Sequence, residues 1–141
     1  MRFWDSSAIV PLLLPEKQTP FCQSLLKKDN LMVVWHYTPT ELLSAIHRKI
    51  RENTLDETDL DLVSQDLEIL SESWIEVLPR IVVRERAHRL LATHPLRAAD
   101  ALQLAAAIIA TNEKPKGSEF VTFDMNLASA ARKEGFVVLA S

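Results

Sequence analysis

Glycine is scarce in this sequence. Only two glycines, Gly117 and Gly135, occur among its 141 residues. The phosphate-binding loops of dinucleotide-binding and P-loop proteins need several closely spaced glycines, because their backbone must approach the phosphates. The chain has no such cluster, which argues against a nucleotide-binding protein of either type.

Cysteine is rarer still. Cys22 is the single cysteine, so an internal disulfide is excluded, and no Cys/His cluster has the spacing of a zinc site. The histidines, His36, His47, His88 and His94, are scattered along the chain and are interpreted as structural or surface residues rather than metal ligands. One cysteine without a disulfide is typical of proteins of the reducing cytoplasm, where we expect this protein.

Long apolar runs and targeting signals are also missing. The first residues, MRFWDSS, lack the basic stretch and apolar run of a signal peptide. The longest apolar stretch, residues 98–110, is shorter than the roughly 20 residues that span a bilayer, and Asp100 interrupts it. With 48% hydrophobic and 25% charged residues, the composition is that of a soluble globular protein. The length fits a single domain over residues 1–141.

The chain has no excess of positive charge. Its 16 Lys and Arg residues against 19 Asp and Glu residues give a net charge of -3, which does not indicate a generally basic nucleic-acid binder. Two local basic runs stand out, IHRKIR at residues 46–51 and RIVVRERAHR at residues 80–89. Each could meet phosphates, although a solvated helix face is the commoner explanation of such a run.

Strand-like and helix-like segments alternate along the chain. Runs rich in β-branched and aromatic residues predict strands at residues 2–4, 31–36, 74–78 and 119–123, and a fifth at residues 136–139. Helical stretches separate these runs. This order predicts an α/β fold in which a mainly parallel sheet is covered by helices on both faces.

Two predicted helix starts carry capping-box patterns. In TPTELL, Thr38 is the expected N-cap, Pro39 the first helical residue and Glu41 the third. TLDE repeats the pattern with Thr54 and Glu57. The helix that follows would carry an apolar stripe that packs either in the core or against a second copy of the chain. The stripe consists of Leu60, Val63, Leu67, Leu70 and Trp74.

Four acidic residues are predicted to meet at one edge of the sheet, because ligands of parallel α/β proteins gather beyond the carboxyl ends of the strands. Asp5 and Asp124 directly follow the first and fourth strands. Glu41 lies in the helix after the second strand, and Asp100 lies early in the apolar helix before the fourth. Clustered carboxylates repel one another unless a cation neutralises them, and oxygen ligands alone suit Mg²⁺ or Mn²⁺. Such a site can activate water for attack on a phosphodiester, which is nuclease chemistry.

Each acid also has a structural explanation. Asp5 and Asp124 stand where N-caps belong, and a cap alone contributes about 1 kcal/mol. Glu41 is accounted for by its capping box. Asp100 and Arg97 lie three residues apart on one helix stripe and could form an ion pair. Both explanations, caps and metal site, stay open at this point.

Four motifs in order resemble the PIN-domain family, and more closely the VapC-type toxin ribonucleases of bacterial toxin-antitoxin pairs. They are FWDSSAIVPLLLPE, PTELLSA, RAADALQLAAA and FVTFDMNLASAA, and the resemblance covers essentially the whole chain. It implies a three-layer α/β/α sandwich around a mainly parallel central sheet. It also implies an endoribonuclease dependent on Mg²⁺ or Mn²⁺, which hydrolyses RNA of the tRNA or rRNA class through a metal-activated water. The implied partners are a cognate antitoxin protein and a second copy of the chain in a homodimer.

The resemblance assigns roles residue by residue. Ser6 matches a small hydroxyl residue after the first acid and would hydrogen-bond a metal ligand or metal-bound water, unless it is a helix cap. Thr122 matches the threonine before the last acid and would orient Asp124. Asn126 would add a polar group near the metal or lie on the helix surface, and Arg97 would contact a substrate phosphate or pair with an acid. The family's metal-binding, catalytic carboxylates match Asp5, Glu41, Asp100 and Asp124.

Two other function classes remain open. Aspartate-based phosphotransfer proteins also place acids at strand ends, but WDSS lacks the Asp-x-Asp of such phosphatases, and EVLPR at the third strand has no phosphoacceptor aspartate. The other alternative is a non-catalytic PIN-like binding or regulatory module whose acids serve as caps. Divalent-metal affinity separates that module from a nuclease.

Overall fold

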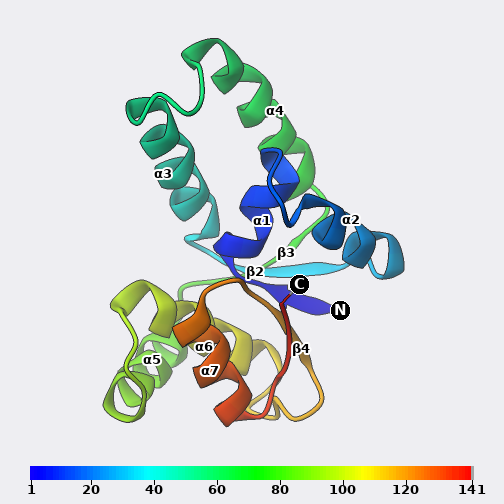
Figure 1. The fold of residues 1–141 in the computed structure, drawn as a ribbon. Helices are drawn as coiled ribbons and strands as arrows, with labels where there is room; N and C mark the ends of the chain where they lie inside the picture. Colours follow the sequence, from blue (N-terminus) through cyan, green and yellow to red (C-terminus); the bar gives the residue numbers. More distant parts are fainter. Residues whose placement is uncertain (141) are drawn as a thin grey trace.

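The computed structural model, described for residues 1–140, contains one five-stranded sheet with helices on both faces (Figure 1). The strand order is β3-β2-β1-β4-β5, and all four pairings are parallel. The α/β fold with a parallel sheet is therefore confirmed, and each strand lies within a segment predicted from the sequence. The strands are β1 (Arg2–Trp4), β2 (Met32–Trp35), β3 (Ile75–Val77), β4 (Glu119–Val121) and β5 (Val137–Leu139).

Helices form the two outer layers. The chain moves outward from β1 to β3 and then returns to the far side of β1 with β4, so right-handed crossovers place the earlier and later helices on opposite faces. The upper layer in Figure 1 contains α1 (Ser6–Leu13), α2 (Thr19–Lys28), α3 (Thr38–Arg51), the short 3₁₀ helix η1 (Glu57–Asp59) and α4 (Leu60–Ser71). The lower layer contains α5 (Ile81–Thr93), α6 (Ala98–Ala110) and α7 (Met125–Glu134).

Each face of the sheet has its own hydrophobic core, because successive strand residues point to opposite faces. Trp4 and Val34 pack under the upper helices, whereas Phe3 and Phe120 stack with ring centroids 5.2 Å apart and pack against the lower ones. The apolar helix α6 lies in this lower core, with most of its residues buried. No helix within residues 1–140 combines the length and apolar character needed to cross a membrane.

Both predicted capping boxes are wrong. Helix α3 begins at Thr38 itself, its N-cap residue is Tyr37, and no side chain caps it. The Glu41 carboxylate accepts hydrogen bonds from residues distant in the sequence instead. Thr54 closes the turn after α3 through its hydroxyl, and Asp56 caps η1 ahead of α4. In both places a partner outside the local pattern determines where the side chain lies.

The apolar stripe predicted for the helix that follows Thr54 and Glu57, which is α4, faces the upper core. Its central members are buried and the others are partly buried against the same core, which answers the choice between core and dimer contact in favour of the core. Helix α4 ends at Ser71, so the last member lies beyond it. The buried residues are Val63 and Leu67, and the partly buried ones are Leu60, Leu70 and Trp74.

The direction in which the chain adds strands to the sheet reverses at β1. Strands β2 and β4 flank β1, and the helices that lead to them cover opposite faces. The loops diverge at such a point, which leaves room for a ligand beyond the carboxyl ends of the strands. Asp5 directly follows β1 and Asp124 lies just beyond β4, so the fold places both acids at this edge.

Candidate active site

Asp5 is the most enclosed acid at this edge. Its side chain is the N-cap of α1, and the residue is 3% exposed. Asp5 Oδ2 accepts hydrogen bonds from Ser7 Oγ at 2.5 Å, Thr122 Oγ1 at 2.9 Å and the Ser7 backbone N–H at 3.3 Å. Within residues 1–140, the only contact of Oδ1 among the side-chain hydrogen bonds is with Ser6 Oγ at 3.5 Å. Burial raises the pKa of Asp5, the bonds from Ser7 and Thr122 partly oppose that rise, and the charge of Asp124 adds to it.

Glu41 reaches the same place from the first turn of α3. Its Oε2 accepts a hydrogen bond from Ser6 Oγ at 2.9 Å, and its Oε1 accepts one from Gln103 Nε2 at 3.0 Å. Gln103 is fully buried in α6 and also donates to Thr38 Oγ1 at 3.2 Å. Burial is the main reason why the pKa of Glu41 rises to about 7; the bond from Ser6 opposes the rise, and the negative charge of Asp5 adds to it.

Asp100 and Asp124 lie in the opposite layer. Burial first, and then the charges of Asp124 and Asp5, raise the pKa of Asp100 to about 6, while the charge of Arg97 lowers it. Arg97 is exposed at the N-cap position of α6, and within residues 1–140 it forms no direct ion pair with Asp100. Asp124 Oδ1 accepts a hydrogen bond from the Leu127 backbone N–H at 2.8 Å and so caps α7. The four predicted acids are therefore electrostatically coupled across both layers.

Hydroxyl groups tie the loop after β4 to Asp5. Thr122 Oγ1 accepts a hydrogen bond from the backbone N–H of Asp124 at 3.1 Å and donates its own hydrogen to Asp5. Its side chain thus contacts the carboxylate of Asp5 and only the backbone of Asp124. Ser7 Oγ donates to Asp5 and accepts from the Phe123 backbone N–H at 2.9 Å.

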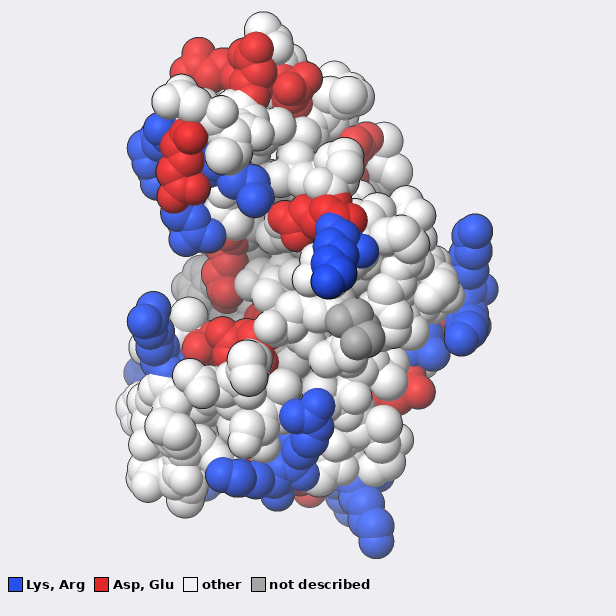
Figure 2. All heavy atoms as spheres, viewed as in Figure 1, with Lys and Arg blue, Asp and Glu red and all other residues white. Residues whose placement is uncertain are grey.

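Asp100 and Asp124 line a recess between the two helical layers, and the charge of Asp5 acts on Asp100 there. Figure 2 shows acidic side chains inside this recess and basic side chains on both of its rims. Asn126 is exposed in the first turn of α7 and borders the recess. The part beside α6 has a volume of about 400 Å³ and is lined by Pro95, Arg97, Ala99, Asp100, Asp124 and Asn126.

The donor groups in the recess suit a divalent cation. No three His, Cys, Asp or Glu side chains in residues 1–140 form a ready-made cage, but Mg²⁺ typically binds one or two carboxylates and keeps several waters. Asp100 receives no protein hydrogen bond in the described part of the chain, and Oδ1 of Asp5 is nearly free. Burial first, and then the charges of neighbouring acids, raise the pKa of Asp5, Glu41 and Asp100, and a bound cation would stabilise the ionised carboxylates against both effects. The residues present therefore fit such an ion.

No sequence pattern identifies Ser7 and Gln103, which hydrogen-bond the acids. Ser7 is the second serine of WDSS, and the backbone N–H that donates to its hydroxyl belongs to Phe123, 116 positions away. Gln103 bonds Glu41 across 62 positions. The available signal for Gln103 was a lone amide in an apolar helix, three residues after Asp100 and on the same stripe.

Comparison with known proteins identifies the family and the fold of this chain. The family model for the PIN domain matches residues 2–133, and proteins of this family are generally metal-dependent nucleases. No curated protein matches the chain. The fold is similar to the crystal structure of PAE2754 from Pyrobaculum aerophilum, with 20% identity, a TM-score of 0.68, and coverage of 97% of this chain and 87% of that one. It is also similar to FitAcB from Neisseria gonorrhoeae, with 17% identity, a TM-score of 0.67, and coverage of 99% and 96%. Since the family model spans most of its length, this chain belongs to the PIN domain family.

Proposed function

We propose that this protein is a metal-dependent endoribonuclease and the VapC-type toxin of a toxin-antitoxin pair. The observation that carries the proposal is the electrostatic coupling of Asp5, Glu41 and Asp100 at one edge of the sheet, where burial and like charge raise their pKa values. Capping explains Asp5 and Asp124, but Glu41 and Asp100 cap no helix within residues 1–140. Repelling carboxylates at such a site are typical of groups that act on a ligand. The non-catalytic module is therefore the weaker alternative.

The chain's own residues would divide the work. Mg²⁺ or Mn²⁺, when bound, supplies charge neutralisation for the phosphodiester and activation of the attacking water. Ser6 and Thr122 hold two of the carboxylates in place through hydrogen bonds. Arg97 is exposed beside the recess and would contact a substrate phosphate, with Asn126 as a further polar group. The proposed metal ligands are Asp5 and Asp100 directly, and Glu41 and Asp124 directly or through water.

Partners follow from the same proposal. The resemblance of the motifs to VapC-type toxins supports a cognate antitoxin protein and a homodimer, and the similarity to FitAcB supports the antitoxin. An antitoxin arginine entering the acidic recess would compete there with the metal and the RNA. We place the activity in the cytoplasm, where the buried Cys22 would remain a thiol.

Cleavage of a mixed tRNA and rRNA pool tests the proposal. We expect discrete cuts with Mn²⁺ or Mg²⁺, none with EDTA, and a loss of roughly 100-fold or more in Asp100→Asn. Asp100→Asn removes a repelling charge from a half-buried position, so the variant should fold, which circular dichroism can verify. Asp61→Asn on the exposed surface of α4 is the matched control.

Two results would contradict the nuclease. Equal cutting by the wild type and Asp100→Asn would trace the activity to a contaminant. If calorimetry detects no site-specific Mn²⁺ binding and no cutting occurs, the non-catalytic module is the better description.

A further inference from the structure

A second pocket adjoins the acidic recess across the start of α6. It has a volume of about 350 Å³ and lies between α5, α6 and the end of β2. Ala98 and Leu102 of α6 line this pocket, whereas Asp100, between them in sequence, lines the recess. Ala98 and Asp100 are two residues apart, so they lie within one turn but point to opposite sides of α6. The two hollows therefore open on either side of the start of this helix, and a single extended ligand that crosses it can contact both.

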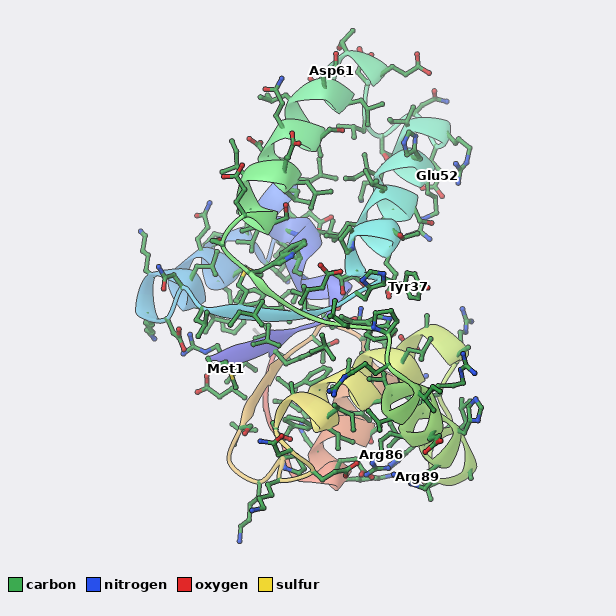
Figure 3. All side chains as sticks on the ribbon, turned by 180° about the vertical axis from the view of Figure 1, so that it is seen from behind. Met1, Tyr37, Glu52, Asp61, Arg86 and Arg89 are labelled. Carbon is green, nitrogen blue, oxygen red and sulfur yellow. The ribbon has the colours of Figure 1, made fainter. Side chains whose placement is uncertain are left out.

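The inner wall of this pocket is aromatic. Trp35, the buried last residue of β2, packs edge-to-face against Tyr37, with ring centroids 5.6 Å apart. Tyr37 is 50% exposed and directly precedes Thr38 of α3. Figure 3 shows Tyr37 at the surface where the two helical layers meet. An exposed aromatic ring that is held in place by a buried neighbour is the kind of surface on which nucleobases stack.

The outer wall carries two arginines. Arg84 and His88 lie one turn apart on one face of α5, and Arg80 is the N-cap residue of that helix. Within residues 1–140, neither arginine forms a salt bridge, and no Asp or Glu lines the pocket. In this part of the chain the two arginines therefore have no counter-charge of their own.

The other arginines of the same basic run behave differently. Arg86 pairs with Glu134 at 2.9 Å, and Arg89 lies 3.8 Å from Glu113. Figure 3 shows both on the lower side of the molecule, away from Tyr37. The run at residues 80–89 is thus divided into a face that ties α5 to its neighbours and a face whose positive charge is available to a ligand.

We infer that this aromatic-arginine pocket, formed by Trp35, Tyr37, Arg80, Arg84 and His88, binds an unpaired base of the RNA strand beside the phosphodiester held in the acidic recess. The inference rests on the proposed function. Tyr37 stacks on the base, and the two arginines contact flanking phosphates, which supply the negative charge missing from the pocket. A base must leave its duplex to stack in this way, so the pocket selects single-stranded or loop RNA.

Binding measured without cleavage tests the inference. The probe is a short fluorescein-labelled 2′-O-methyl RNA of mixed sequence, single-stranded or annealed to its complement, titrated in EDTA at several salt concentrations. We expect Tyr37→Ala to weaken single-strand binding about tenfold and duplex binding little, while Tyr37→Phe, which keeps the ring, binds as the wild type does. Tyr37 is half exposed, so neither change disturbs the core.

The charge arm uses two arginines of one helix. Arg84→Gln should weaken binding and lower the slope of log affinity against log salt by about 1. Arg89→Gln removes the same charge outside the pocket and should change neither quantity. Equal effects of these two variants would mean that Arg84 contributes only non-specific electrostatic attraction, which would overturn the inference.

Other results distinguish failure of the inference from failure of the nuclease. If the wild type cleaves RNA but Tyr37→Ala binds the single strand normally, the pocket holds no base. If Tyr37→Ala changes the molar mass in light scattering and not RNA affinity, the pocket is a protein interface. If the pocket variants lose binding but the wild type never cleaves RNA with Mn²⁺, the nuclease fails, and with it the placement beside a scissile bond.

Discussion

Gln103 is a buried amide that links the two helical layers. Its Nε2 donates to Glu41 and Thr38 of α3 from inside the apolar helix α6. Its Oε1 has no hydrogen-bond partner within residues 1–140. A buried polar atom without a partner costs free energy, so this side chain contributes less to stability than to the position and charge of Glu41.

Replacing Gln103 with Met, an apolar residue of similar length, should test that role. Glu41 would lose one of its two donors and become easier to protonate, since the bond from Gln103 lowers its pKa. We expect RNA cleavage to fall about tenfold, and the rising limb of the pH-rate profile to move to higher pH. Gln65→Met on the exposed surface of α4 is the control. An unshifted profile in a folded Gln103→Met protein would show that Gln103 does not act through Glu41.

Local sequence patterns predict the strands better than they predict the side-chain contacts at the start of a helix. The five strands were predictable because short runs of β-branched and aromatic residues between turn signals are a local pattern. The capping box at Thr38 was not, because the carboxylate of Glu41 bonds Ser6 and Gln103, 35 and 62 positions away. Local patterns cannot reveal such competing partners.

The same distinction applies to the site. Asp5 and Asp124 could be placed together from sequence, since parallel strands end at one edge of a sheet. The hydrogen bonds of Ser7 depend on how the loop after β4 sits over α1, which only the packed structure determines. The direct pairing of Arg97 with Asp100 failed for a similar reason, because the exposed arginine at the helix start does not reach the acid.

Asp124 combines a helix cap with a proposed metal ligand, and two variants separate the roles. Asn caps a helix about as well as Asp, whereas Ala does not. We expect Asp124→Asn and Asp124→Ala both to lower cleavage, but only Asp124→Ala to lose the cap, which makes it about 1 kcal/mol less stable than Asp124→Asn in urea denaturation. Both variants lack the charge, so their difference isolates the cap. Full cleavage by Asp124→Asn would leave Asp124 as a cap alone.

In the molecule as a whole, the acidic side chains of the site lie at the edge of the sheet, between its two hydrophobic cores. Folding raises the pKa of Glu41 from 4.5 to about 7 and that of Asp100 from 3.8 to about 6, both mainly through burial. Over this range the folded state binds more protons than the unfolded state, so stability falls as pH rises. The metal-free protein should accordingly be least stable at the pH where its carboxylates are ready for a cation.

Thermal unfolding across pH measures this effect. In EDTA, we expect the Tm to decrease by several degrees as the pH rises from about 5 to 8. Mn²⁺ binds the ionised carboxylates, so the Tm gained on adding it should grow over the same range. A Glu41→Gln, Asp100→Asn double variant should lose most of both effects. A metal-free Tm that rises toward pH 8 would contradict the raised pKa values.

The pairing of β1 with β4 also sets when the site can exist during protein synthesis. Asp5 is translated 117 positions before Thr122, which bonds its carboxylate. Contacts between such distant segments form late, because most of the chain must be ordered first. On the ribosome, the nascent chain therefore carries no complete acid cluster until Asp124 has been translated. The order of translation itself keeps the unfinished chain from holding a complete site.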